Sequence, residues 1–218
     1  MLEAVIFDFD GVLVDTPSYY FKHMREYLEK LNTDITDEDV SNLVGMTFAK
    51  KLAYINEKYK LNVQREPFVR DTSAAMMAEM EKSLLLDEHL DMLLRSLKKS
   101  KIRMAIASNN SRPNIDFFLK KLEIAHYFSN IISYEDVTEH KPNPETYLKA
   151  VQTIRARASN CIAIEDTAIG LDSAKGAGLK CIAIPNKFTS LQDFRSADLV
   201  IKNFTEINPA KLKSMVAK

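Results

Sequence analysis

Short apolar runs alternate with helical patterns along most of this chain, and this alternation restricts the fold more than any other feature of the sequence. The first run covers residues 4–7, and others follow at 103–108, 130–133, 161–164, 180–184 and 199–201. Helical patterns separate the later runs, at 112–122, 144–156 and 168–175. Strands that are apolar throughout are typical of a parallel sheet buried on both faces. The sequence therefore predicts an α/β fold with helices on both sides of a parallel sheet.

A long segment between the first and second apolar runs has no strand signal. Phe21, Met24, Leu28 and Leu31 recur at helical spacing, and residues 36–39 fit a capping box that begins a second helix. Leu52, Ile55 and Tyr59 mark a third helix, and Val69, Thr72, Met76 and Met80 mark a fourth. We therefore predict one α/β core built from residues 1–16 and 84–218, interrupted by an all-helical domain at 17–83.

The composition excludes several classes of protein. Apolar residues make up 46% of the 218 residues, which is enough for a sizeable core. Lys plus Arg and Asp plus Glu both number 30, so the net charge predicts no nucleic acid partner and no anionic membrane partner. No apolar run is long enough to span a bilayer, and the N-terminal segment lacks the basic region of a signal peptide.

The two cysteines, Cys161 and Cys181, both lie in predicted strands. We expect buried thiols in a reducing compartment rather than a disulfide. These features together predict a cytoplasmic protein, and its even charge and compact size favour a monomer.

Two acidic residues, Asp8 and Asp10, follow the first buried run directly. Carboxylates at the end of such a strand are costly to bury without a partner, and a divalent cation is the obvious one. Gly11 then supplies the backbone freedom for a tight turn. A carboxylate held against a metal is a competent nucleophile toward phosphorus, so this segment predicts phosphoryl chemistry.

Other polar residues follow the later strands, at the edge of the sheet where open parallel sheets bind their ligands. Ser108 ends the second strand, where its hydroxyl and the next backbone amide could bind a phosphoryl oxygen. Lys141, in a proline-rich turn, would neutralise a nucleophile and an incoming phosphate. Glu165 and Asp166 add carboxylates that suit Mg²⁺. The histidines show no spacing typical of a zinc site, and we expect surface or packing roles for His23, His89, His126 and His140.

The segment Asp8 to Asp15 resembles motif I of the haloacid dehalogenase superfamily, Asp-x-Asp-Gly-x-[Leu/Ile/Val]-x-Asp. Ser108 resembles motif II, residues 141–144 resemble the Lys-Pro-x-Pro of motif III, and residues 165–170 resemble the Glu-Asp-[Ser/Thr]-x-x-Gly of motif IV. The resemblance implies a Rossmann-like core with a helical cap of the C1 class. It implies that Asp8 forms an aspartyl-phosphate and that Asp10 acts first as general acid and then as general base.

The same resemblance implies the remaining site residues. The catalytic residues would be Asp8, Asp10, Ser108 and Lys141. Mg²⁺ would be bound by Asp8, the Asp10 carbonyl and Asp166, with Glu165 bonding the metal's waters. The phosphate and substrate would be bound by Gly11, Thr16, Asn109, Gly45, Met46 and Thr47, the last three in a loop that resembles the specificity loop of C1 caps.

The presence of Asp10 favours phosphoryl transfer over dehalogenation, and the chain resembles most the subfamily of β-phosphoglucomutase and small-molecule phosphatases. Phe48 stands where those mutases have an arginine, and Tyr20 stands where they have a histidine. We therefore predict a Mg²⁺-dependent phosphatase acting on a small phosphorylated metabolite.

Several alternatives stay open. A phosphomutase would use the same residues, and Arg70 could supply the missing cation. Met46 and Phe48 could simply be packing residues between the cap and the core domain instead of contacting substrate. A catalytically silent sensor of a phosphorylated ligand would not need Asp10, and a receiver domain would lack the helical insertion.

Overall fold

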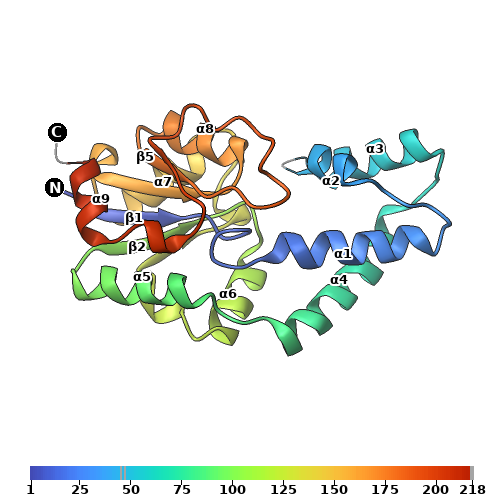
Figure 1. Cartoon of the computed structure of the whole chain (residues 1–218), viewed down its shortest axis with the longest axis horizontal. Coiled ribbons are helices and arrows are strands. Elements are labelled where there is room, and N and C mark those ends of the chain that lie inside the picture. The colour runs from blue at the N-terminus through green and yellow to red at the C-terminus, as the bar shows by residue number, and fades with distance from the viewer. Residues whose placement is uncertain (45, 47, 217–218) are drawn as a thin grey trace. The chain divides into compact units, whose positions relative to one another are not determined.

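A parallel six-stranded sheet forms the centre of the computed structural model, which describes residues 1–44, 46 and 48–216 (Figure 1). Its strand order is β3-β2-β1-β4-β5-β6. The strands are β1 (Ala4–Phe7), β2 (Arg103–Ala107), β3 (Asn130–Ile132), β4 (Cys161–Glu165), β5 (Lys180–Ala183) and β6 (Leu199–Val200). The predicted α/β fold with a Rossmann-like parallel sheet is therefore confirmed, and each predicted strand lies within one residue of its observed bounds.

The described residues divide into two compact units, Met1–Val14 with Leu85–Lys218 and Asp15–Leu84. The first unit holds the sheet and the helices α5 (Glu88–Lys99), α6 (Arg112–Lys121), α7 (Glu145–Thr153), α8 (Ala168–Gly176) and α9 (Pro209–Met215). The second unit holds α1 (Thr16–Glu29), α2 (Asp37–Leu43), α3 (Phe48–Tyr59) and α4 (Arg65–Ser83). Asp15 and Thr16 fall in the helical unit because Asp15 caps the N-terminus of α1 by accepting from the Ser18 amide.

The strand β1 lies in the middle of the sheet and pairs in parallel with β2 on one side and β4 on the other. Ala4 is opposite Arg103 in β2 and Cys161 in β4. The strands β2 and β3 are added on one side of β1, and β4, β5 and β6 are added on the other. Open α/β sheets form their binding sites where the strand order reverses in this way. The residues after β1, β2 and β4 are therefore the ones that the fold brings together.

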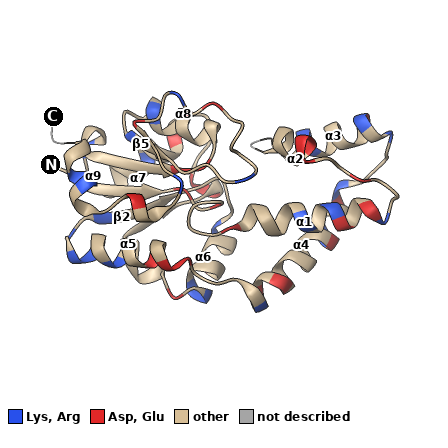
Figure 2. Ribbon diagram, in the orientation of Figure 1, with Lys and Arg blue, Asp and Glu red and all other residues tan. Residues whose placement is uncertain are grey.

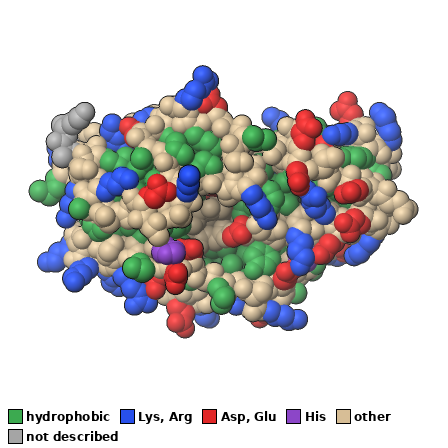
Figure 3. All heavy atoms as spheres, in the orientation of Figure 1, with side chains coloured by type: hydrophobic (Ala, Val, Ile, Leu, Met, Phe, Trp, Pro, Cys, Tyr) green, Lys and Arg blue, Asp and Glu red, His purple; other side chains and the backbone are tan. Residues whose placement is uncertain are grey.

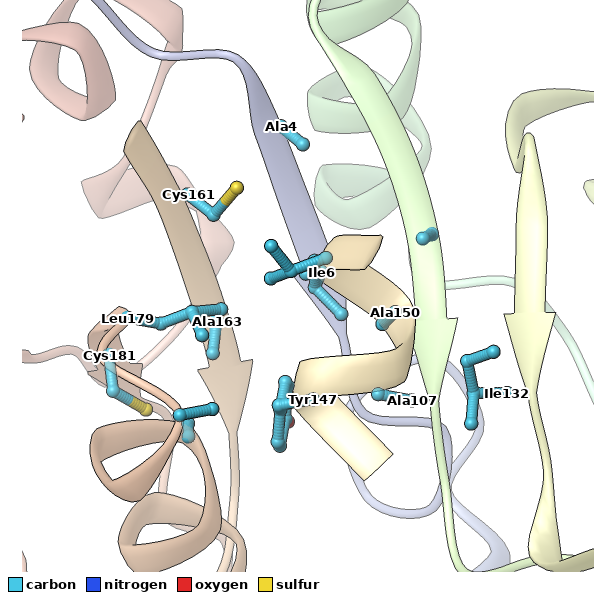
Figure 4. Packing of buried hydrophobic residues seen from close by; sticks show 14 of the residues in the cluster. Ala4, Ile6, Ala107, Ile132, Tyr147, Ala150, Cys161, Ala163, Leu179 and Cys181 are labelled. Atoms are coloured by element: carbon cyan, nitrogen blue, oxygen red, sulfur yellow. The ribbon is translucent and has the colours of Figure 1, made fainter. Parts of the chain in front are cut away.

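Helices cover both faces of the sheet, with α7 and α8 on one face and α5 and α6 on the other (Figure 1). Small residues on the strands, such as Ala107 and Ala163, lie beneath Tyr147 and Ala150 of α7 (Figure 4). Small strand residues let a helix approach the sheet closely, and here they make room for the large side chain of Tyr147. Cys161 and Cys181 are buried in the same cluster as free thiols, as predicted.

A buried aspartate joins two helices of the helical unit. Asp39 completes the predicted capping box with Thr36 at the start of α2 and is fully buried. Its carboxylate also accepts from the Tyr54 hydroxyl at 2.7 Å, from the Tyr59 hydroxyl at 2.5 Å and from the Lys58 ammonium. Burial by itself raises the pKa of Asp39, but these hydrogen bonds outweigh it and hold the pKa below its usual range. The carboxylate therefore ties α2 to α3.

Two details of the predicted helical stripes are wrong. Leu31 lies beyond the end of α1 and is 42% exposed, because Asn32 adopts a left-handed backbone (φ 56°) and the chain turns there. In α4 the buried position is Phe68 rather than Val69, and its ring contacts Tyr27 of α1 at 4.9 Å between centroids. Adjacent side chains on a helix point in directions that differ by about a quarter of a turn, so Phe68 and Val69 cannot both face the core. Phe68 is the one that does.

Three features of the sheet-containing unit differ from expectation. Ser111, a plausible N-cap for the helix predicted at 112–122, precedes α6 but makes no capping bond with its side chain, and Glu135 accepts from the Arg112 amide instead, at 2.9 Å. The helix α7 begins after Pro144 and ends three residues earlier than predicted, where Arg155 turns into a left-handed backbone (φ 52°). The final helix α9 was not predicted at all.

Side chains of both charges are present on the face that Figure 3 shows. Acidic and basic residues are interspersed over both units (Figure 2) and over the face shown in Figure 3. Among the described residues, no helix is both long enough and apolar enough to cross a membrane. The cytoplasmic location and the monomeric state stay predictions.

Candidate active site

Three carboxylates meet at the carboxyl ends of the central strands. Asp8 follows β1, Glu165 ends β4 and Asp166 comes next. One oxygen from each of these side chains lies within 4.8 Å of the others, and all three residues are buried. These acidic groups therefore lie at the carboxyl ends of the strands, the edge of the sheet at which the sequence predicts the site.

The ammonium of Lys141 lies inside this group of carboxylates. Its Nζ donates to Asp8 Oδ1 at 2.5 Å, to Glu165 Oε1 at 2.7 Å and to the Ala107 carbonyl at 2.7 Å. Three acceptors match the three protons of an ammonium. Burial alone would lower the pKa of Lys141, but the charges of Asp8 and Glu165 outweigh it and raise the pKa above its usual value. Lys141 is therefore charged and fixed in position.

Glu165 orients this ammonium from a fully enclosed position. Its Oε1 also accepts from the Tyr147 hydroxyl at 2.7 Å, and its Oε2 accepts from the Thr167 hydroxyl at 3.3 Å. A Cβ on Gly170 would lie 2.0 Å from the Glu165 carboxyl carbon, so only glycine leaves room for this carboxylate. Glu165 thus has partners on both oxygens within the protein.

Asp166 is held differently, with one oxygen paired and the other open. Its Oδ2 accepts from Asn186 Nδ2 at 2.8 Å. Gly11, in a left-handed backbone (φ +83°), passes so close that a Cβ there would lie 2.1 Å from the same oxygen. Its Oδ1 is buried, and among the described residues it has no hydrogen-bond partner. A buried, unpartnered carboxylate oxygen is typical of a metal ligand.

The electrostatics of the group also fit a cation. Burial raises the pKa of the Asp8 carboxyl to about 8, and the Lys141 ammonium opposes that rise. The carboxylates of Glu165 and Asp10 raise the pKa of Asp8 further. Burial and these neighbouring charges also raise the pKa of Asp166 well above its usual range. One ammonium does not balance the buried carboxylates, so a bound divalent cation would allow Asp8 and Asp166 to ionise.

Asp10 points to the loop that follows β2. Both of its carboxylate oxygens lie near Asn110 Nδ2, at 3.0 and 3.1 Å. In the same loop, the buried hydroxyl of Ser108 accepts from the Asn110 amide at 3.0 Å, which leaves its own proton free to be donated. The Asn109 side chain bonds the backbone of Lys141, accepting from its amide at 3.2 Å. The loops after β1 and β2 and the turn at Lys141 thus support one another.

The other predicted substrate residues lie elsewhere in the chain. Thr16 and Met46 belong to the helical unit, whereas Gly45 and Thr47 lie outside the described residues. Their roles stay predictions.

Two residues of the helical unit that bear on the choice between phosphatase and mutase have partners there. The ring of Phe48 packs on Phe68 of the same unit at 5.7 Å between centroids, and the alternative that Phe48 packs between the cap and the core stays a prediction. Arg70, the alternative cation, pairs with Asp71 at 2.7 Å on the surface.

Three residues of the site were missed from the sequence: Asn110, Tyr147 and Asn186. Asn186 comes just after β5, so the rule that sites form at the carboxyl ends of strands could have identified it. Asn110 lies next to Asn109 in an already selected loop. Tyr147 had no comparable signal, because an aromatic residue in a helix is most often a core residue.

Comparison with known proteins agrees with this geometry. The family model of haloacid dehalogenase-like hydrolases matches residues 5–184. The chain is 26% identical to the phosphorylated carbohydrates phosphatase of Thermotoga maritima, over 83% of this chain and 84% of that one. It is also 26% identical to the β-phosphoglucomutase of Bacillus subtilis, over 94% and 92% of the two chains.

A solved structure is similar over a still larger part of the chain. It is a variant of CbbY from Rhodobacter sphaeroides in complex with xylulose-1,5-bisphosphate, with 26% identity, a TM-score of 0.83, and coverage of 97% of this chain and 99% of that one. The family match spans most of the sequence and includes Asp8, Lys141, Glu165 and Asp166. The chain therefore belongs to the haloacid dehalogenase-like hydrolases.

Proposed function

We propose that this protein is a Mg²⁺-dependent phosphatase that hydrolyses a small phosphorylated metabolite through an aspartyl-phosphate on Asp8. Its broad class, a phosphomonoester hydrolase of the haloacid dehalogenase-like family, follows from the family match and the relatives. The observation that carries the proposal is the buried group in which Asp8 contacts Lys141 at 2.5 Å, beside Asp166 with one open oxygen.

In the first half of the proposed reaction, a carboxylate oxygen of Asp8 attacks phosphorus and the bond from phosphorus to the leaving oxygen breaks. Asp10 donates a proton to that leaving oxygen. Lys141 and the Ser108 hydroxyl offset the negative charge of the transferring group. Lys141 contacts Asp8 directly, and the Ser108 hydroxyl is held by the Asn110 amide in the loop that follows the neighbouring strand.

In the second half, Asp10 removes a proton from a water molecule, and the water oxygen attacks phosphorus. The bond from phosphorus to Asp8 breaks, which releases inorganic phosphate and restores the Asp8 carboxylate. Asp10 thereby regains the proton that it lost in the first half, so one carboxyl group serves both steps.

Asp8, Asp166 and the Asp10 carbonyl would hold the magnesium ion, with Glu165 beside them. When bound, the ion would neutralise the acidic group and stabilise the charge of the phosphoryl group. The open Oδ1 of Asp166 supports this assignment, as does the preference of Mg²⁺ for oxygen ligands.

The substrate class is proposed as a sugar phosphate or a similar phosphomonoester. The Thermotoga relative is a phosphatase of phosphorylated carbohydrates, and the CbbY variant binds a ketose bisphosphate. We further propose that the helical unit, with Gly45, Met46, Thr47 and Thr16, acts as the cap that selects the substrate.

A phosphomutase is the second candidate, because the similarity to a β-phosphoglucomutase extends over nearly the whole chain. The two reactions share the first half and differ in whether water or a sugar hydroxyl takes the phosphoryl group. The packing of Phe48 within the helical unit, where the mutases have an arginine, supports the phosphatase.

The test is an assay of purified protein with MgCl₂ against a panel of phosphorylated metabolites, with released phosphate as the readout. We expect phosphate release that requires Mg²⁺ and disappears in Asp8→Asn. β-Glucose 1-phosphate with the 1,6-bisphosphate is included, and glucose 6-phosphate is followed separately. Isomerisation without phosphate release would establish the mutase, and ligand binding without either activity would establish a sensor.

A further inference from the structure

An asparagine outside the four family motifs faces the proposed general acid. Asn110 lies two residues after Ser108, in the loop that follows β2, and Asp10 lies in the loop that follows the neighbouring strand β1. Asn110 Nδ2 is 3.0 Å from Asp10 Oδ1 and 3.1 Å from Asp10 Oδ2. The amide therefore faces both oxygens of the carboxylate rather than one.

The orientation of this amide is fixed by its other end. Asn110 Oδ1 accepts from the Ser111 amide at 2.8 Å and from Asn114 Nδ2 at 3.1 Å. Turning the amide over would place its NH₂ group against these two donors, so the amino group has to face Asp10.

The backbone of Asn110 is fixed as well. Its amide donates to Ser108 Oγ at 3.0 Å, and its carbonyl accepts from the Tyr134 amide at 2.9 Å. The residue is thus held on both sides by neighbours that do not depend on Asp10.

We propose that Asn110 is a positioning residue that holds the Asp10 carboxyl group where it can exchange a proton with the leaving oxygen. This inference rests on the proposed function. Asp10 is only half-buried and lies in a turn, and the Asn110 amide donates toward both oxygens of its carboxylate from a fixed position. A carboxyl group displaced by about 1 Å loses on the order of 100-fold in rate, which makes such support consequential.

Two substrates with different leaving groups distinguish a loss of Asp10 positioning from a general loss of active-site structure. A sugar phosphate leaves as an alkoxide and needs a proton, whereas p-nitrophenyl phosphate leaves as a stable phenolate and needs little acid help. The parameter kcat/KM reports the first half of the reaction only, in which Asp10 acts as the acid. We therefore expect Asn110→Ala to lower kcat/KM about 10- to 100-fold for the sugar phosphate found in the panel and less than about threefold for p-nitrophenyl phosphate.

In a second variant, Asn110→Asp, the new side chain has nearly the same shape as asparagine. Asn110→Asp keeps an oxygen for the Ser111 amide but replaces the donor that faces Asp10 with another oxygen. We expect it to lose at least as much activity on the sugar phosphate as Asn110→Ala. It also carries the test if the alanine variant does not fold.

The matched control is Asn208→Ala, which removes the N-cap of α9 by deleting the acceptor of the Ala210 and Lys211 amides. This change lowers the melting temperature without touching the site, and we expect both substrates to be turned over as in the wild type.

A double-variant cycle provides the last measurement. If Asn110 acts through Asp10, then Asn110→Ala changes the sugar-phosphate rate by less than about twofold in an Asp10→Ala background.

Three results would overturn this role and leave the proposed function standing: equal losses on both substrates, an undiminished effect in the Asp10→Ala background, or full activity of Asn110→Asp. The first two would place Asn110 in substrate binding or loop support. A wild-type protein without Asp8-dependent hydrolysis would overturn the proposed function together with this role, and the Asp8→Asn control distinguishes that case.

Discussion

Replacing Tyr147 by phenylalanine tests how much one buried hydroxyl stabilises the acidic group. The hydroxyl donates to Glu165 Oε1 at 2.7 Å, and neither side chain is more than 1% exposed. A hydrogen bond to a charged group contributes about 1.5–3 kcal/mol. Glu165 Oε1 keeps the Lys141 ammonium after the change, so we expect a loss of about 2 kcal/mol, in the lower half of that range. For a chain of this length that loss lowers the melting temperature by roughly 4–8 °C.

The free energy of unfolding would be measured by urea titration followed by circular dichroism, alongside a thermal scan. Tyr134→Phe is the matched control, because Tyr134 is 52% exposed and we expect its hydroxyl to contribute less than about 0.5 kcal/mol. Since Lys141 keeps Asp8 and the Ala107 carbonyl as partners, activity should fall less than about tenfold. An unchanged urea midpoint for Tyr147→Phe would refute the reasoning that Glu165 needs this donor.

Three further changes follow from the same structure. Gly170→Ala places a methyl group 2.0 Å from the Glu165 carboxylate, so we expect loss of activity and a lower melting temperature; a normal thermal scan would contradict the close contact. Asn186→Ala frees Asp166 to rotate, and calorimetric titration should show Mg²⁺ bound about 10-fold more weakly, whereas an unaltered affinity would count against its supporting role. Because the folded protein lowers the pKa of Asp39, its contribution is present above the unfolded value of about 3.9 and declines as the pH falls below it. The urea midpoint should therefore drop between pH 5 and pH 3 more in the wild type than in Asp39→Asn.

The sheet was readable from the sequence because its strands are buried on both faces. Runs such as residues 161–164 contain no polar residue, so their pattern does not depend on which neighbours pack against them. The same reasoning located Asp8, Ser108 and Asp166, since each follows a strand whose end the pattern marks. The order of the strands along the chain and their parallel direction were sufficient to predict that these three residues lie at the same edge of the sheet.

Contacts that depend on tertiary packing were not readable in this way. The amide of Asn110 faces Asp10 only because β2 lies beside β1. The sequence alone does not indicate which residue an asparagine in a loop will contact. Tyr147 reaches Glu165 because α7 packs over small strand residues. Helical periodicity predicts that Tyr147 is buried but not which side chain its hydroxyl contacts.

The helix α9 was missed for a different reason. It is seven residues long and has one fully buried side chain, Leu212, so its periodic signal is weak even though Asn208 and Pro209 form a recognisable start.

The central place of β1 also determines when the parts of this protein can form during synthesis. Ala4 is made before both of its partners, Arg103 and Cys161, so neither neighbouring strand exists when β1 leaves the ribosome. Contacts this distant in sequence form slowly, because closing the intervening loop costs entropy before pairing can offset it. The helical unit Asp15–Leu84 is complete much earlier in translation. We expect it to fold first, while the strand that leads to the nucleophile remains unpaired until at least its first partner strand, β2, has been made.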